Sequence, residues 1–291
     1  MPSLKDLKIR INTVKSTQKI TTAMKLVASA KLRKAQEKAV SSRPYALRMS
    51  NIISELASNL DSDSGPELLF GRGKQDKVLL IAVSADRGLC GGFNSNIIKE
   101  VRRKVDELET SGKEAKLIFI GSKLNNVLKN SMKKNIVASF SGLQGDNISF
   151  SKVVPITDKI ISLFESGEIN KVDLVFNKFQ SVISQIVTSK TLVPAEISSE
   201  DNQENKSSPF EYEPDDNSIL DELIPRNLST QIYSAIIESN AGELAARMTA
   251  MDNATRNAGE LIDRLTLVYN RTRQTFITNE LIEIISGAEA V

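Results

Sequence analysis

The residues best placed to do chemistry form a glycine-rich loop, Asp86-Arg87-Gly88-Leu89-Cys90-Gly91-Gly92, between an apolar run and a helical pattern. Phosphate-binding turns lie between a strand and a helix, because backbone N–H groups at a helix start can hold an anion. The spacing here is neither GxGxxG nor GxxxxGKS/T. It favours a tight structural turn over nucleotide binding. A second basic, glycine-rich stretch, residues 71–74, precedes its strand and is interpreted as a loop.

The composition excludes several catalytic classes. The 291-residue sequence contains no His and a single Cys, Cys90. The absence of His removes the commonest general base and the commonest metal ligand, so Ser-His-Asp, Cys-His and His-metal chemistry are excluded. One thiol can form neither an intrachain disulfide nor, without His, a structural zinc site. We therefore expect a reducing compartment, no cofactor and no metal.

The first 60 residues predict one long helix. Between residues 3 and 60 the sequence has no Gly and one proline, Pro44, where the helix could bend. Its apolar residues begin with the three-four spacing of a helix face and then drift around the helix surface. These positions are Leu4, Leu7, Ile11 and Val14, followed by Ile20, Met24 and Val27.

The C-terminal segment predicts a second long helix, of roughly 90 to 100 Å at about 1.5 Å per residue, which would project beyond a compact domain. Apolar or small residues recur at alternating spacings of four and three, which is a coiled-coil seam. The helix could begin after Pro214 or only after Pro225, and residues 196–215 are expected to form an acidic mobile loop. The seam consists of Leu244, Met248, Met251, Thr255, Ala258, Ile262, Leu265, Tyr269, Thr272 and Phe276.

Residues 75–195 predict a compact domain of alternating strands and helices, and hence a small parallel sheet wrapped by helices. A further strand region is expected between Val182 and Val193. Because this domain carries the chain back, the helices of residues 1–60 and 216–291 can pair antiparallel. The other expected strands are 78–83, 116–120 and 172–176, and the expected helices are 94–108 and 152–164.

Charge and hydropathy limit the possible partners. The net charge is +2 and the sequence has no Trp, so nucleic acid is not expected as a partner. The N-terminus lacks a secretory pattern, and no window approaches eighteen apolar residues, so any link to a membrane should run through partners. The first forty residues nevertheless carry ten Lys and Arg against two acidic residues. This cationic stripe is either a solvated helix face or a surface for acidic partners.

Three segments resemble the gamma-subunit family of F-type ATP synthases. The C-terminal segment from Ile277 to Ala290 matches every required position of the family signature: Ile-Thr, Glu280, Glu283 and Gly287-Ala288. The N-terminal helix is similar in Thr17-Gln18-Lys19-Ile20-Thr21 and in residues 23–28, and the loop 84–94 is a third match. The resemblance spans both ends and the middle of the chain.

The resemblance implies a fold and a role. The fold would be α/β, a long antiparallel coiled-coil hairpin of the terminal helices with an inserted Rossmann-like domain. The chain would be a non-catalytic rotor that turns inside the hexamer of alpha and beta subunits and couples proton flow to ATP synthesis or hydrolysis on the beta subunits. Its partners would also include the epsilon subunit and the c-ring. It would lie on the cytoplasmic face of the bacterial inner membrane, and the mitochondrial matrix side is the less favoured alternative.

The resemblance also implies contact residues. The shaft of this family runs against acidic lever segments of the beta subunits, whereas plain salt bridges within a helix are the alternative role for each charged residue. The apolar end, Leu281, Ile282, Ile284 and Ile285, would turn as a bearing inside an apolar collar. The candidate contacts are Met24, Lys25, Lys31 and Arg33 on the first helix, and Arg271, Arg273, Gln274 and Glu280 on the last.

Two other classes of function compete with this one. An αβ enzyme could use Asp86, Arg87 and Cys90 at the strand end. A coiled-coil scaffold or nucleic-acid binder could use the basic N-terminal helix. ATP-site labelling of the isolated chain would support the enzyme, and salt-sensitive retention on DNA would support the binder.

Overall fold

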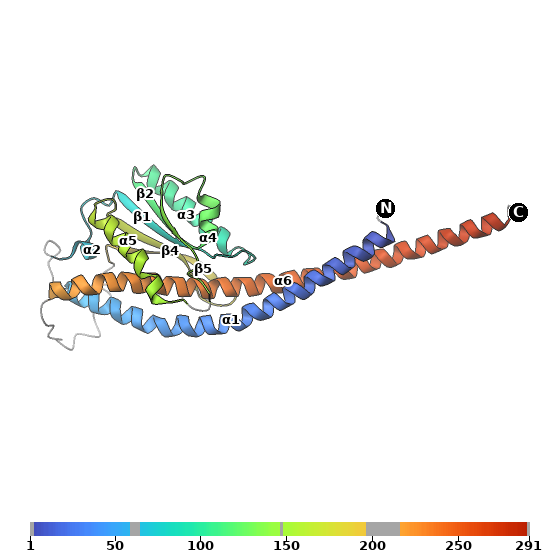
Figure 1. Ribbon diagram of the computed structural model, residues 1–291, viewed down its shortest axis with the longest axis horizontal. Coiled ribbons are helices and arrows are strands. Elements are labelled where there is room, and N and C mark those ends of the chain that lie inside the picture. The colour runs from blue at the N-terminus through green and yellow to red at the C-terminus, as the bar shows by residue number, and fades with distance from the viewer. Residues whose placement is uncertain (1–2, 59–64, 146–147, 196–215, 290–291) are drawn as a thin grey trace. The chain divides into compact units, whose positions relative to one another are not determined.

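The computed structural model describes residues 3–58, 65–145, 148–195 and 216–289 (Figure 1). Two long helices, α1 (Leu4–Ser58) and α6 (Asp216–Glu289), flank a five-stranded sheet with its own helices, as the fold class predicted. Contacts divide the chain into two units: a helix pair of residues 1–29 and 247–291, and a sheet unit of residues 30–246. The predicted acidic loop 196–215 lies outside the described residues.

The sheet of the sheet unit has the strand order β3-β2-β1-β4-β5. Strand β1 (Lys77–Val83) is parallel to β2 (Glu114–Ile120) and to β4 (Lys171–Phe179), and β2 is parallel to β3 (Ile136–Phe140). Strand β5 (Gln185–Val193) is the further strand region expected between Val182 and Val193, and it runs antiparallel to β4 at the edge of the predicted parallel sheet. Residues 180–184 join the two strands directly, and so short a connection can only form a hairpin.

Both faces of the sheet are buried, because the side chains of β1 alternate between two apolar layers. Leu80 and its neighbours pack against α3 (Phe93–Thr110) and α4 (Ser122–Leu128). Ile81 and its neighbours pack against α5 (Val154–Glu165), α6 and the part of α1 in this unit. The predicted apolar runs therefore form the central strands, and α3 and α5 match the expected helices to within a few residues.

Four short elements were not predicted from the sequence. They are α2 (Glu67–Phe70), α4, β3 and the 3-10 turn Phe150–Lys152. Each has seven residues or fewer, which is too short for a clear apolar period. Helix α1 continues through Pro44, which is exposed, so water can reach the side of the helix that proline deprives of a hydrogen bond. Helix α6 begins at Asp216, after Pro214, and continues through Pro225.

Candidate partner interface

The helix pair is held by a narrow seam with the period of a coiled coil. On α1 the buried residues Leu7, Ile11, Thr21 and Ala28 fall at spacings of four, ten and seven residues. On α6 the predicted seam is confirmed from Met251 to Thr272. Met251 and Ala258 are buried, and the other predicted positions of that stretch are partly buried. Small side chains at these positions let the two backbones approach closely.

The predicted course of the seam along α1 is wrong beyond Val14. Ile20 is 60% exposed and Val27 is 56% exposed, and the seam passes instead through Gln18, Thr21 and Lys25. The four-three spacing of the seam continues from Val14 to Gln18 and Thr21, whereas Ile20 follows Val14 by six residues and therefore lies on another face of the helix. Met24 is partly buried beside this seam.

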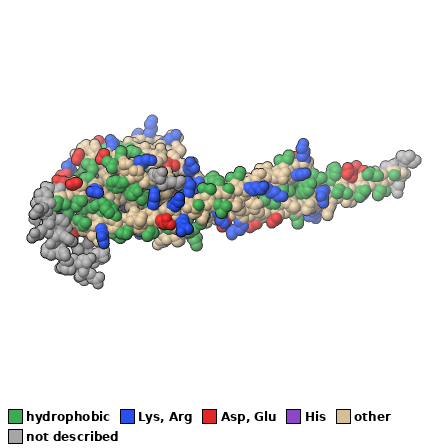
Figure 2. All heavy atoms as spheres, turned by 60° about the horizontal axis from the view of Figure 1, so that its bottom comes forward, with side chains coloured by type: hydrophobic (Ala, Val, Ile, Leu, Met, Phe, Trp, Pro, Cys, Tyr) green, Lys and Arg blue, Asp and Glu red, His purple; other side chains and the backbone are tan. Residues whose placement is uncertain are grey.

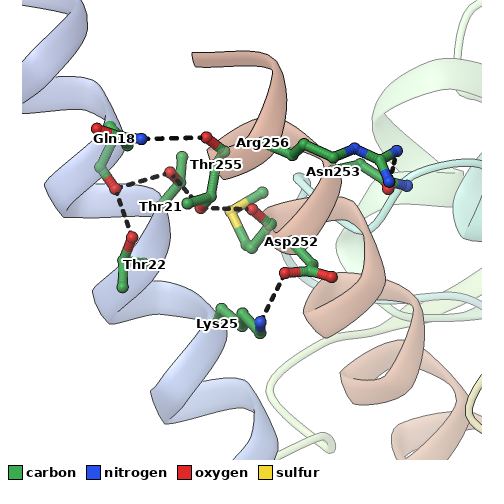
Figure 3. A network of polar contacts seen from close by, with 9 residues as sticks. Gln18, Thr21, Thr22, Lys25, Asp252, Asn253, Thr255 and Arg256 are labelled. Atoms are coloured by element: carbon green, nitrogen blue, oxygen red, sulfur yellow. Dashed lines mark hydrogen bonds and ion pairs between the residues drawn. The ribbon is translucent and has the colours of Figure 1, made fainter. Parts of the chain in front are cut away.

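Polar contacts occupy the middle of the seam (Figure 3). The Thr255 hydroxyl donates to Thr21 Oγ1 at 2.8 Å, and Gln18 Nε2 donates to the Thr255 carbonyl at 3.5 Å. Lys25 Nζ lies 2.6 Å from Asp252 Oδ1. The pairings run in opposite directions along the two helices, which confirms the antiparallel arrangement. Polar pairs inside an apolar seam favour one register over its shifted alternatives.

The ion pair of Lys25 with Asp252 affects ionisation at the seam. The hydrogen bond from Lys25, together with its charge, lowers the pKa of the Asp252 carboxyl. Both side chains are largely exposed. Lys25 was predicted to face a partner protein, but in the isolated chain it already neutralises a carboxylate of its own helix pair.

The other predicted contacts fall into two groups. Lys31 and Arg33 are exposed in the sheet unit, where Arg33 lies 3.4 Å from Glu37, one turn along the same helix. The remaining four belong to the helix pair, and all of them are exposed: Arg271, Arg273, Gln274 and Glu280. The eight predicted contacts therefore belong to two different units, with Lys31 and Arg33 in the sheet unit and the other six in the helix pair.

The last turns of α6 are uncovered. Figure 1 shows α6 running past the start of α1, and every residue from Arg273 to Ser286 is exposed. Six large apolar side chains lie on this segment, each between 47% and 66% exposed, and green side chains mark it in Figure 2. They are Phe276, Ile277, Leu281, Ile282, Ile284 and Ile285. We call this segment, residues 273–286, the apolar tip.

The glycine-rich loop of the sheet unit forms a tight turn. Asp86 accepts hydrogen bonds from the backbone N–H groups of Ser122 and Gly142, at 2.9 and 3.0 Å. Asn94 Nδ2 donates to the Cys90 thiol at 3.2 Å, and that thiol is buried. Of the three groups that an enzyme could have used, Asp86 and Cys90 therefore hold loops together and Arg87 is exposed, which favours the structural interpretation of this motif.

Metal sites and membrane-spanning helices were both considered for the described residues. Within the described ranges, no group of three Cys, Asp or Glu side chains is placed to hold a metal ion. In the same residues, no helix is both long and apolar enough to cross a bilayer. The candidate interface consists of the seam, the exposed charges and the apolar tip.

Comparison with known proteins gives a consistent family. The family model described as ATP synthase matches residues 3–291. The ATP synthase gamma chain of Sinorhizobium medicae is 51% identical over 292 residues, and that of Dinoroseobacter shibae is 48% identical over 292, each covering all of both chains. A chain of the Euglena gracilis mitochondrial ATP synthase (OSCP/F1/c-ring) has the same fold, with a TM-score of 0.68 at 18% identity, covering 99% of this chain and 94% of that one. This chain belongs to the ATP synthase gamma chain family.

Proposed function

We propose that the chain is the central rotor shaft of an F-type ATP synthase and contributes no catalytic residue. The full-length family match carries this proposal, together with a helix pair whose apolar tip is exposed among the described residues. The shaft couples transmembrane proton flow to ATP synthesis or hydrolysis on the beta subunits. It does so by contacting partner conformations differently as it turns, since a shaft shifts an equilibrium only through differential contact.

The partners follow from the same role. The helix pair turns within the hexamer of alpha and beta subunits, and the sheet unit connects to the epsilon subunit and the c-ring. The chain works on the cytoplasmic face of the bacterial inner membrane and is held there through these partners. We also propose that the chain is divided into residues 1–60, 75–195, 196–215 and 216–291.

The exposed charges suit acidic partner segments. Arg271 is exposed on the part of α6 that pairs with α1, and Arg273 is exposed at the edge of that part. Gln274 adds an exposed amide donor. Opposite charges across such an interface fix orientation and speed encounter more than they add affinity. Lys25 would act through its pair with Asp252, so it presents less net charge than the sequence suggested. Met24, Lys31, Arg33 and Glu280 complete the proposed contacts.

The apolar tip suits a bearing. Leu281, Ile282, Ile284 and Ile285 are all more than half exposed, which costs free energy unless a partner covers them. Apolar contact is non-directional, so a collar of apolar side chains can cover the tip at every angle of rotation. Directional hydrogen bonds would instead favour particular angles.

Coexpression with alpha and beta subunits tests the proposal. We expect copurification at one chain per three alpha-beta pairs, with ATP turnover that falls sharply when this chain is left out. The Arg273→Ala variant should lower turnover, whereas Lys129→Ala, at an exposed lysine of the sheet unit, should not. Failure to copurify, or ATPase activity in this chain alone, would refute the rotor and favour an enzyme in the sheet unit.

A further inference from the structure

A buried carboxylate joins three elements of the sheet unit. Glu238 of α6 is 5% exposed, and its Oε1 accepts a hydrogen bond from Arg43 Nε of α1 at 2.7 Å. Its Oε2 accepts from the Phe179 backbone N–H, at the end of β4, at 3.0 Å. Arg43 Nη2 donates to the Phe179 carbonyl at 3.3 Å. Both long helices are thus bonded to the same residue of the sheet.

This three-way cluster of Arg43, Phe179 and Glu238 adds directional bonds to a largely apolar interface, in which Lys190 of β5 also donates to Gln231 of α6 at 2.8 Å. Around it, α1 and α6 pack on the sheet through aliphatic side chains such as Ala39, Ile236 and Ile237. Apolar contacts resist separation, but the hydrophobic effect is non-directional, so they define an angle or a register less sharply than hydrogen bonds do. Hydrogen bonds lose energy steeply when distance or angle changes, so the cluster resists sliding or twisting of either helix on the sheet.

The energetics also set this ion pair apart from surface pairs. Taking a carboxylate out of water is costly, and well-packed apolar residues often replace a buried ion pair at no loss of stability. The bond to Glu238 raises the pKa of Arg43, so the arginine stays charged at every relevant pH. The Glu238 carboxylate is buried, whereas the Arg43 side chain is 42% exposed. A pair with one buried partner that packing could replace is expected to serve specificity of geometry as well as stability.

We propose that the cluster is a torque clamp, which holds α1 and α6 at a fixed angle to the sheet while the shaft works against a proton gradient. The inference rests on the rotor function proposed above. Arg43 and Glu238 are then positioning residues: ATP turnover without opposing force does not need them, and coupling under force does. Loss of the clamp lets the helices twist on the sheet, so that turnover is no longer restrained by the gradient.

The test uses the complete ATP synthase in sealed membrane vesicles. The Arg43→Met/Glu238→Met double variant removes the directional bonds but keeps apolar volume. Its matched control is Arg103→Met/Glu107→Met, which removes an exposed ion pair on α3. Three quantities are measured: ATP hydrolysis, ATP-driven proton pumping, and the stimulation of hydrolysis when an uncoupler dissipates the gradient.

For the clamp variant we expect hydrolysis with uncoupler within twofold of the parent, pumping per ATP lowered at least threefold, and little uncoupler stimulation. The control should match the parent in all three. Parent-like pumping and stimulation in the clamp variant would overturn the clamp. If that variant does not assemble, Arg43→Lys is tested in its place, because lysine keeps the charge but not both guanidinium bonds. Pumping per ATP and the stimulation of hydrolysis by uncoupler then decide in the same way. A parent complex whose hydrolysis and pumping do not require this chain would instead refute the rotor itself.

Discussion

Replacing Gly121 with alanine should disrupt the sheet unit far more than replacing Gly112. Gly121 follows β2 with φ +105°, and an added Cβ would lie 2.1 Å from the Ser84 carbonyl oxygen. Gly112 follows α3 with φ +70°, and an added Cβ would meet nothing within 4 Å. Both glycines therefore have a positive φ, and they differ in the space that an added Cβ would find.

The magnitudes follow from that difference. At Gly112 alanine meets only the left-handed penalty, about 1–2 kcal/mol. At Gly121 the backbone penalty of about 1–3 kcal/mol is joined by an overlap with main chain. Relieving that overlap means moving the end of β1, at a further cost of about 1–3 kcal/mol, as in overpacked cores. We expect a total of about 2–6 kcal/mol, a large share of the ~5–15 kcal/mol stability of a typical domain.

Urea unfolding of the purified chain, followed by circular dichroism, measures both variants against the parent. Gly121→Ala should move the midpoint of the sheet-unit transition to much lower urea, or yield no folded sheet unit, with Gly112→Ala in between. An equal cost at both sites would refute the reasoning, because it would mean that Ser84 can shift freely.

Three further predictions concern the seam and the glycine-rich loop. Ala28→Leu should destabilise the helix pair by about 1–3 kcal/mol in thermal melts, since Ala28 is buried in a close contact. The depressed pKa of Asp252 means that its ion pair stabilises the fold above the carboxyl's ordinary pKa and is lost as pH falls through the depressed value. Asp252→Asn should therefore reduce the loss of stability in acid, measured as urea midpoint against pH, and leave it unchanged if the pair contributes nothing. Asp86→Ala should cost about 1–3 kcal/mol in urea unfolding, because two backbone N–H groups lose their acceptor.

Patterns confined to one segment were readable from the sequence. The α6 seam could be predicted because Met251, Ala258 and Leu265 repeat every seven residues on a single helix. The central strands could be predicted because a strand buried on both faces is a continuous apolar run. The short elements α4 and β3 could not, because their residues are ordered by contact with α3 and β2 and not by a period of their own.

The α1 seam shows how a correct rule can choose the wrong residues. Ile20 and Val27 are apolar and were placed on the buried stripe, whereas Thr21 lies in the seam and is bonded to Thr255. Apolarity indicates what can be buried, but the spacing that continues the seam decides which residues face the partner helix. Ile20 and Val27 are therefore left exposed on the surface of the helix pair.

Charged residues show the same limit more sharply. Arg33 and Glu37 lie one turn apart, so their pairing is visible in the sequence, yet they are exposed and weakly coupled. Arg43 and Glu238 are separated by 195 positions, and each taken alone resembles a solvated helix residue. Only the fold brings them together with Phe179 and buries the carboxylate. Sequence spacing could therefore not reveal this bonded link between the two long helices and the sheet.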